Sequence, residues 1–496
     1  MFSDTRFKFF TSREASPSLG LSIIPMAVLL VTLTFILIFA GASGVQDASP
    51  IVLSGIALLT AILTLVFTRR PARTLIMGLR RSAVQILPAI PLLLCIGALA
   101  TTWMISGVIP LFISIGTQLL SPTFFLASAC IICSAVSVVT GSSWTTIATV
   151  GVALSGIGEA MGLSPAWIAG AIISGAYFGD KVSPLSDTTV LAASSCGIPL
   201  FRHIRFLMLT SIPAMFIAIA VFAGVGLLNS PEYFSPSNIV SALGSTFNLT
   251  LWLLIVPGFS AVLIVCRLDS LKTLFLSAIA GLIAFFIFQP QLCNVMIGDS
   301  IWETIKDSII TVWSGASPST GDSQTDSLIE TGGISGMLPT VLLVSSAMLF
   351  GGMLIGSGML NRITAFFAGL FRKTAPLVGA TVTSGLFLNS CTGDQYLSIV
   401  IGGNLYRSVY RRQGLADEML SRSLEDSISV TSVLIPWNSC GMTQSAVLGV
   451  ATITYFPCCI FNLASPLLSV LYAWIGFKIR KKEPLKIPSM QTAPSR

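Results

Sequence analysis

Charged residues are scarce in this 496-residue chain: only 9% of its residues are Asp, Glu, Lys or Arg, whereas 53% are hydrophobic. Soluble domains contain roughly 25% charged residues, so the composition excludes a soluble globular protein and indicates a polytopic membrane protein. The basic residues gather in short clusters between apolar runs. The net charge of +7 therefore follows membrane topology, and no nucleic-acid partner is expected.

Histidine is almost absent, with His203 as the single example, and the ten cysteines are scattered along the chain. These residues offer no transition-metal constellation, and the sequence contains no Ser/His/Asp set and no cofactor fingerprint. Cysteines in apolar runs behave as small hydrophobic residues. We therefore expect a protein that is not an enzyme and that has no cofactor, with Na⁺ only as a transported or coupling ion.

About ten apolar runs are long enough to cross a hydrocarbon layer of roughly 30 Å. They lie near residues 21–41, 50–68, 84–109, 164–200, 206–228, 249–266, 271–289, 338–360, 431–456 and 457–477. Two further runs, 123–157 and 376–406, are interrupted at Thr140-Gly141 and Thr392-Gly393. Basic residues flank the second of these runs on both sides, so a re-entrant hairpin that returns to the same membrane face fits best. The same interpretation applies to the first.

Lysine and arginine also predict the orientation of the chain. The connections 42–49 and 229–248 contain neither residue, and the segment 291–337 carries acidic residues against Lys306 alone. These segments are expected outside, because basic residues concentrate in cytoplasmic connections. Both termini are then cytoplasmic, and we expect a multi-pass protein of the bacterial cytoplasmic (inner) membrane.

A shift of 251–252 residues aligns two halves of the chain. It pairs, in order, Leu87-Pro88 with Leu338-Pro339, Ser106-Gly107 with Ser357-Gly358, Thr140-Gly141 with Thr392-Gly393, Gly162-Leu163 with Gly414-Leu415, and Pro184 with Pro436. The first half begins on the arginine-rich side and the second begins after the acidic outer segment, which predicts an inverted repeat. The expected organisation is 1–83 N-terminal spans and a basic connection, 84–228 first repeat, 229–335 connecting spans and outer segment, 336–477 second repeat, and 478–496 basic tail.

Each repeat contributes one hairpin tip and one proline-broken helix, around 183–187 and 435–439. Broken helices leave backbone carbonyls and amides unpaired, and hard oxygen ligands suit Na⁺. Charge at membrane depth is costly, so the carboxylates at these breaks are expected to be functional. The candidate ion-binding residues are Asp180, Asp187, Asp394, Asn438, Ser183, Ser186, Thr140, Ser142 and Thr392. The alignment places Ser142 opposite Asp394, Asp187 opposite Ser439 and Ser186 opposite Asn438.

Candidates for proton coupling are Asp180, Lys181, Asp187, Glu425 and Asp426. Two alternatives stand beside this hypothesis. Asp180 and Lys181 are adjacent and would also make a structural ion pair. The polar segment 411–427 is interpreted as an interfacial amphipathic helix, which would place Glu425 and Asp426 on its solvated face.

Five segments resemble the NhaC family of sodium/proton antiporters, within the larger ion transporter superfamily. They are SGAYFGDKVSPLSDTT (174–189), LFRHIRFLMLTSIPA (200–214), TGDQYLSIVIGGNLY (392–406), GLADEMLSRSLEDS (414–427) and VTSVLIPWNSCG (430–441). The resemblance extends from about residue 85 to residue 477. It implies an inner-membrane carrier that exchanges Na⁺ for H⁺, and for the superfamily it suggests a homodimer.

The sequence therefore predicts an all-α polytopic membrane protein with an inverted repeat, two re-entrant hairpins and two broken transmembrane helices. Its expected function is secondary active exchange of Na⁺ for H⁺ by alternating access. The alternative is a Na⁺-coupled symporter or antiporter of a small organic solute, such as an amino acid or a carboxylate. Hydroxyl-rich hairpin tips and half-helix N-termini would suit a substrate carboxylate. The lipid bilayer, Na⁺ and H⁺ are the expected partners.

Overall fold

A computed structural model describes residues 17–68, 70–228, 236–266, 268–292, 301–369 and 374–481. Within these ranges the chain is helical, and its only β structure consists of two isolated bridges, Ala316 with Thr331 and Leu415 with Lys481. Seven helical segments are long and apolar enough to cross a membrane, or up to nine if each of two bent pairs counts as one span. An all-α polytopic membrane protein is therefore confirmed, while the expected ten spans remain a prediction.

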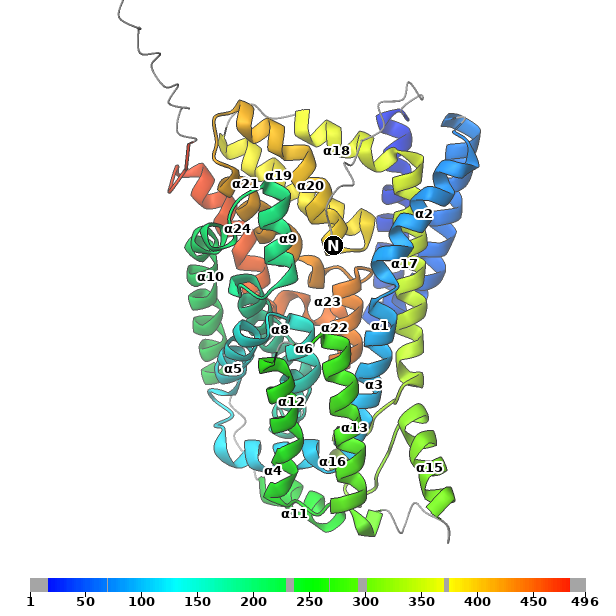
Figure 1. The fold of residues 1–496 in the computed structure, drawn as a ribbon, viewed down its shortest axis with the longest axis vertical. Coiled ribbons are helices and arrows are strands. Elements are labelled where there is room, and N and C mark those ends of the chain that lie inside the picture. The colour runs from blue at the N-terminus through cyan, green and yellow to red at the C-terminus, as the bar shows by residue number, and fades with distance from the viewer. Residues whose placement is uncertain are drawn as a thin grey trace, which may run out of the picture.

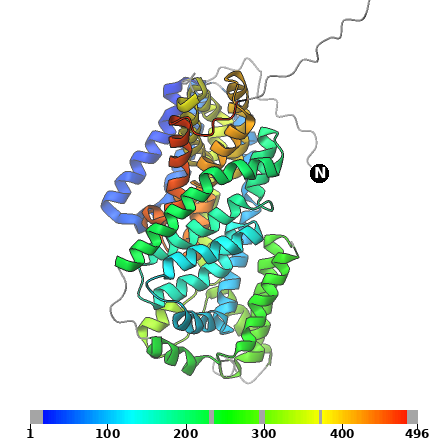
Figure 2. The ribbon, with the colours of Figure 1, turned by 90° about the vertical axis from the view of Figure 1, so that its left-hand side faces the viewer.

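The long apolar helices form the frame of the molecule (Figure 1). They are α1 Leu19–Leu63, α2 Ala72–Ile86, α3 Ala89–Ile105, α5 Phe125–Thr140, α10 Leu200–Leu228, α13 Ser270–Phe288 and α17 Leu338–Ser357. Helix α1 is kinked at Gly41, where φ is 71° and ψ is −169°, a conformation open to glycine. Figure 2 shows the two parts of α1 folding back along each other, so α1 supplies two candidate spans, Leu19–Val45 and Asp47–Thr68.

The interrupted runs form helical hairpins with the expected breaks. In the first, α5 ends at Thr140 and is followed by α6 Ser143–Thr146, the π-helical turn η2 Ile147–Gly151 and α7 Val152–Ala160. In the second, α19 Thr374–Thr392 is followed by α20 Gln395–Arg412. Gly141 and Gly393 lie at the breaks in the left-handed conformation, which L-residues with a Cβ adopt only at a cost.

Two further helices break where proline was noted. Helix α8 Pro165–Val182 is followed, after Ser183–Ser186, by α9 Asp187–Cys196. The second consists of α21 Asp417–Leu424, the π-helical turn η5 Glu425–Ser429, the 3₁₀ turn η6 Ser432–Leu434 and then α22 Ser439–Leu448. In Figure 1, α9 lies above α8 whereas α21 lies above α22. The chain therefore passes through the two breaks in opposite directions.

Local backbone conformation repeats with the predicted shift. Gly107 and Gly358, Gly141 and Gly393, Gly162 and Gly414, and Gly197 and Gly449 are all left-handed, and the members of each pair are 251 or 252 positions apart. In Figure 1 the hairpin of α19 and α20 occupies the upper half and that of α5 and α6 the lower half.

The remaining helices connect these parts. They are α4 Val108–Leu119, α11 Pro236–Thr246, η3 Leu251–Leu254, α12 Ile255–Val265, α15 Ile301–Ser314, α16 Ser323–Leu328, η4 Ser335–Met337, α18 Met359–Gly369, α23 Thr452–Tyr455, η7 Phe456–Cys458 and α24 Ile460–Trp474. Helix α11 meets η3–α12 at 90°, and α23–η7 meets α24 at 59°. These are the two bent pairs.

Glycines let several helices approach within backbone contact. A Cβ placed on Gly78 of α2 would lie 2.2 Å from the carbonyl oxygen of Gly352 and 2.5 Å from the amide nitrogen of Gly356, both on α17. A Cβ on Gly175 of α8 would lie 2.1 Å from the carbonyl oxygen of Cys130 on α5. Small residues at such crossings permit close packing, which drives helix association inside a membrane.

Candidate ion-binding site

A cavity of about 630 Å³ brings together both hairpin tips and both broken helices. Five of the predicted ion-binding residues line it: Thr140, Ser142, Asp180, Asp187 and Asp394. Further lining residues are Pro88, Ala89, Pro91, Leu92, Gly141, Trp144, Thr145, Leu185, Thr188, Ile264, Leu268, Asp269, Ser270, Leu271, Thr273, Gln395, Tyr396 and Ser439. A cavity of this size accommodates a hydrated ion or a small solute.

The first hairpin tip is a compact set of hydroxyl contacts. The Thr140 hydroxyl accepts from the backbone amide of Ser142 at 3.2 Å and lies 3.1 Å from the Thr146 hydroxyl. The Ser142 hydroxyl accepts from the Thr145 amide at 3.2 Å and thereby caps α6. Serine is a favoured residue at such a cap. The tip therefore holds its oxygen atoms in fixed positions at the wall of the cavity.

The second hairpin tip repeats this geometry with a carboxylate in place of the hydroxyl. The Thr392 hydroxyl accepts from the Asp394 amide at 3.2 Å and lies 2.7 Å from the Ser398 hydroxyl. Asp394 caps α20 by accepting from the Leu397 amide at 2.8 Å. Ser142 and Asp394 have matching backbone angles, φ −147° and −146°. The local geometry therefore agrees with the predicted alignment of these two residues.

Asp180 is bound to the first hairpin tip. Its Oδ2 accepts from the Ser143 hydroxyl at 2.7 Å and from the Ser143 amide at 3.1 Å. Hydrogen bonds to a charged group are worth roughly 1.5–3 kcal/mol each, more than neutral ones. Asp180 thus links α8 to α6 while it lines the cavity.

The polar residues at the two helix breaks either cap a helix, face the cavity or hold the break against a neighbouring helix. Ser186 and Asn438 cap α9 and α22, accepting from the amides of Thr189 at 3.4 Å and Cys440 at 3.1 Å. Asp187 is therefore the first residue of α9, where it is exposed to the cavity. Ser183 donates to the Val138 carbonyl at 2.8 Å, which fixes the break against α5. Ser183, Ser186, Thr392 and Asn438 lie beside the cavity rather than among its lining residues.

The cavity is electronegative. Asp180, Asp187, Asp269 and Asp394 line it, together with hydroxyl oxygens, and the lining residues that the structure describes include no lysine, arginine or histidine. One sign of charge in a low-dielectric cleft concentrates counter-ions. Within the described ranges, no three His, Cys, Asp or Glu side chains are placed to share a metal ion. A bound Na⁺ would therefore take a mixed set of carboxylate, hydroxyl and carbonyl oxygens.

Lys181 points away from this cavity into a second, fully buried polar cluster. Its ammonium forms an ion pair with Asp426 and donates to the Ser465 hydroxyl at 2.7 Å. Thr210 and Ser465 also donate to Asp426, at 3.1 and 2.9 Å. The alternative that Lys181 pairs with Asp180 is therefore wrong, because successive residues on a helix face different directions.

The interpretation of 411–427 as an interfacial helix with a solvated face is also wrong. The side chains of Arg422, Glu425 and Asp426 are completely buried, because α10, α19 and α24 pack around α21 and η5. The Arg422 guanidinium lies over the Phe206 ring, 4.7 Å from its centroid. Both carboxylate oxygens of Glu425 lack a hydrogen-bond partner among the described residues.

Sequence reasoning assigned no role to several residues of the site. Ser143 follows the first hairpin tip, but its contact with Asp180 depends on how α6 packs on α8. Asp269 lies between Arg267 and Lys272 in sequence, and it caps α13 by accepting from the Leu271 amide at 2.9 Å. Gln395 and Tyr396 follow Asp394 and could have been suggested by that position.

Alanine at either hairpin-tip glycine should destabilise the protein, and more at Gly141 than at Gly393. Both substitutions force a left-handed backbone on an L-residue, at roughly 1–2 kcal/mol. A Cβ at Gly141 would lie 2.6 Å from the Leu185 Cβ, whereas at Gly393 the nearest atom is the Ala347 Cβ at 3.3 Å. The overpacked site should lose a further 1–3 kcal/mol, roughly. Thermal unfolding in detergent would compare the two variants, and equal transition temperatures would contradict the expectation.

The apolar helices, the broken hairpins and the carboxylate-lined cavity define a membrane transporter for cations. A model of the Na⁺/H⁺ antiporter family matches residues 7–197 and 175–477, and the chain belongs to that family. It is 34% identical over 395 residues to the Na⁺/H⁺ antiporter NhaC of Alkalihalophilus pseudofirmus, covering 79% of this chain and 83% of that protein.

Two other relatives are named for organic solutes. The chain is 32% identical over 393 residues to a malate-2H⁺/Na⁺-lactate antiporter of Bacillus subtilis, covering 79% of this chain and 81% of that protein. It is 31% identical over 484 residues to the arginine/ornithine antiporter ArcD of Halobacterium salinarum, covering 96% of each. The similarity thus extends to antiporters that are named for different substrates.

Proposed function

We propose that this family member exchanges Na⁺ for H⁺ across the membrane through the carboxylate-lined cavity, by alternating access. The observation that carries the proposal is the convergence of Asp180, Asp187 and Asp394 on one cavity, with no cationic side chain among its described lining residues. A carboxylate bears either a proton or a Na⁺ ion, so binding of the two is mutually exclusive. This exclusion is the physical basis of exchange.

The neutral ligands of Na⁺ are proposed to come from both hairpin tips and both breaks. Thr140 and Ser142 line the cavity directly. Thr392, Ser183, Ser186 and Asn438 lie next to it, where their hydroxyl or amide groups fix the backbone of the breaks. Their contribution is to hold carbonyl and carboxylate oxygens at ligand distance, because binding sites depend on the groups that support the ligands.

Proton coupling is proposed to involve Asp180 and Asp187 in the cavity, with Lys181, Glu425 and Asp426 behind it. Lys181 forms an ion pair with one oxygen of Asp426, and the other oxygen lies 3.9 Å from Arg422 Nε. Glu425 is buried with no hydrogen-bond partner among the described residues, and a buried carboxylate without partners is expensive unless it carries a proton. Glu425 is therefore the most suitable of the three to carry a proton.

The topology is proposed to be an inverted repeat with about ten spans and two re-entrant hairpins. The paired left-handed glycines and the opposite directions of the two broken helices support it. The basic clusters support cytoplasmic termini and a place in the bacterial cytoplasmic membrane. A homodimer is proposed by resemblance to the superfamily.

A second candidate is Na⁺-coupled transport of a small organic solute. The cavity volume of about 630 Å³ exceeds the needs of a bare ion, and two relatives are named for organic substrates. The four aspartates that line the cavity would repel a carboxylate. If a solute is carried, the site therefore favours a cationic one.

Purified protein in liposomes that contain a pH-sensitive dye would test the proposal. A Na⁺ gradient is imposed alone, then with a panel of amino acids, amines and carboxylates, and a K⁺ gradient serves as the control. We expect proton movement with Na⁺ alone. Silence until a solute is added would overturn Na⁺/H⁺ exchange in favour of solute coupling.

A further inference from the structure

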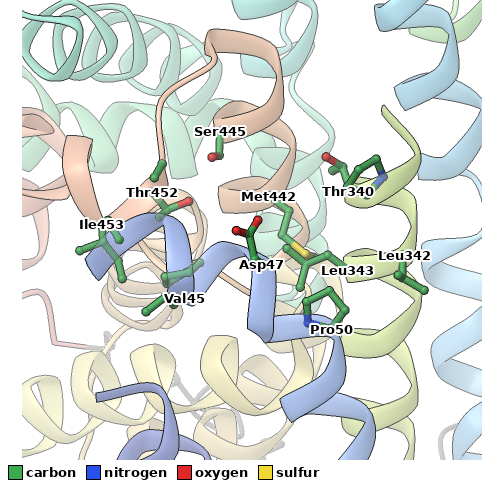
Figure 3. Close-up of a pocket in the computed structure, with 14 residues that line it drawn as sticks. Val45, Asp47, Pro50, Thr340, Leu342, Leu343, Met442, Ser445, Thr452 and Ile453 are labelled. Carbon is green, nitrogen blue, oxygen red and sulfur yellow. The ribbon is translucent and has the colours of Figure 1, made fainter. Parts of the chain in front are cut away.

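A second, smaller cavity of about 190 Å³ lies between α1, α17 and the second broken helix (Figure 3). Asp47 is its single charged lining residue and points into it, towards Met442 and Ser445. Hydroxyl groups of Thr340, Ser445 and Thr452 also line it. Nothing in the site described above uses this cavity.

The two cavities meet opposite sides of the same helix break. Pro436 and Met442 line the small cavity, whereas Ser439 lines the large one. Between them the chain is tightly held. Trp437 is 7% exposed and its indole donates to the Ser390 carbonyl at 2.8 Å, and the Ser439 amide donates to the Gly393 carbonyl at 2.8 Å. The layer between the cavities is therefore the break itself, packed against the second hairpin tip.

The sequence assigns the two cavities to opposite membrane faces. Asp47 belongs to the connection 42–49, which contains no lysine or arginine. The large cavity is lined by Leu268 to Leu271, which lie between Arg267 and Lys272. By the distribution of basic residues, the small cavity faces outside and the large one faces the cytoplasm.

We propose that the small cavity is the outer entrance to the transport pathway and that Asp47 attracts Na⁺ into it. The proposal rests on the proposed Na⁺/H⁺ exchange. A carboxylate in a narrow cleft raises the local concentration of cations, and hydroxyl oxygens replace water ligands of the entering ion. Movement of the 435–439 break against α17 would connect this entrance to Asp394.

The first test removes one carboxylate from the small cavity and, in a separate variant, one carboxylate from the large cavity. Asp47→Asn and the matched variant Asp269→Asn are reconstituted with known orientation, and Na⁺ is offered from one side at a time. Asp47→Asn should raise the KM for outer Na⁺ by roughly tenfold at low ionic strength, with kcat and the KM for cytoplasmic Na⁺ unchanged. Choline chloride at high concentration should reduce the difference in KM for outer Na⁺ between Asp47→Asn and the wild type, because salt screens the Asp47 charge. Asp269→Asn should affect only cytoplasmic Na⁺.

A second test needs no transport. Ser445→Cys and, as the inner counterpart, Ser270→Cys are made in a background in which exposed Cys266 and Cys293 of the predicted outer segment are replaced by serine. Intact vesicles of this background and of each variant are treated with a membrane-impermeant thiol reagent. Ser445→Cys should react from outside only and Ser270→Cys from the cytoplasmic side only.

The two tests separate the possible failures. If the wild-type protein moves no protons with Na⁺, the proposed function fails, and labelling alone decides whether the cavity is an outer entrance. An equal change of KM on both sides for Asp47→Asn, no change on either side, or no outside labelling at Ser445→Cys would overturn the outer entrance.

Discussion

Replacing Asp180 by asparagine should lower the affinity for Na⁺ by roughly 10–100-fold and suppress exchange. The substitution removes one charged ligand, and a hydrogen bond or contact with a charged group is worth roughly 1.5–3 kcal/mol, where each 1.4 kcal/mol is tenfold in affinity. Asparagine can still accept from the Ser143 amide and hydroxyl, so the link between α8 and α6 should persist. The measurement is the Na⁺ concentration for half-maximal proton flux in proteoliposomes, together with the maximal rate.

Two comparisons make the Asp180 result interpretable. Asp394→Asn should behave similarly, because Asp394 lines the same cavity from the other repeat and asparagine also caps helices well. Asp326→Asn, in the outer segment, should leave the Na⁺ dependence unchanged. Wild-type Na⁺ dependence in both Asp180→Asn and Asp394→Asn would show that the cavity is not the ion site.

Replacing Lys181 by methionine should destabilise the protein by roughly 1–3 kcal/mol, because the buried Asp426 carboxylate loses its closer cation and keeps only Arg422, whose Nε lies 3.9 Å from Asp426 Oδ2. The Lys181 and Asp426 side chains are at most 1% exposed, so water cannot compensate. Asp426→Asn alone should cost more, roughly 3–5 kcal/mol, because it removes the carboxylate that faces both the Lys181 ammonium and the Arg422 guanidinium. Thermal unfolding in detergent and the yield of folded protein would measure both effects.

The double variant Lys181→Met/Asp426→Asn should be more stable than Asp426→Asn, because only the Arg422 guanidinium then lacks its carboxylate partner. Neutral replacements of a buried pair are often tolerated, and asparagine can still accept from Thr210 and Ser465. A double variant that is no more stable than Asp426→Asn would contradict a structural role for the pair of Lys181 and Asp426. If it folds but exchanges Na⁺ for Na⁺ without moving protons, the pair itself takes part in proton coupling.

The breaks of the fold could be predicted from the sequence because their causes are local. Glycine after Thr140 and Thr392 permits the left-handed turn, and Pro184 and Pro436 lack the amide that would continue a helix. Asp180, Asp187 and Asp394 stood out because charge is rare in apolar runs. The structure places all three in one cavity.

The partners of the charged residues could not be predicted, because they depend on contacts between distant segments. Lys181 pairs with Asp426, 245 residues away, rather than with its neighbour Asp180. The segment 411–427 has the charge content of a surface helix, and only the surrounding helices show that residues 418–427 are buried. A single sequence gives the periodicity of a helix but not which of its faces meets protein instead of water.

The seam between α2 and α17 determines which parts of the molecule can move. Gly78 meets Gly352 and Gly356 backbone to backbone, with no intervening layer of side chains that could rearrange into a second packing. The contact between α2 and α17 therefore has a single packing arrangement, and the two helices move together as one rigid body. Because α17 also forms a wall of the small cavity, that wall is stationary relative to α2. The conformational change that opens the small cavity towards Asp394 is then a movement of its opposite wall, the broken helix that carries Pro436.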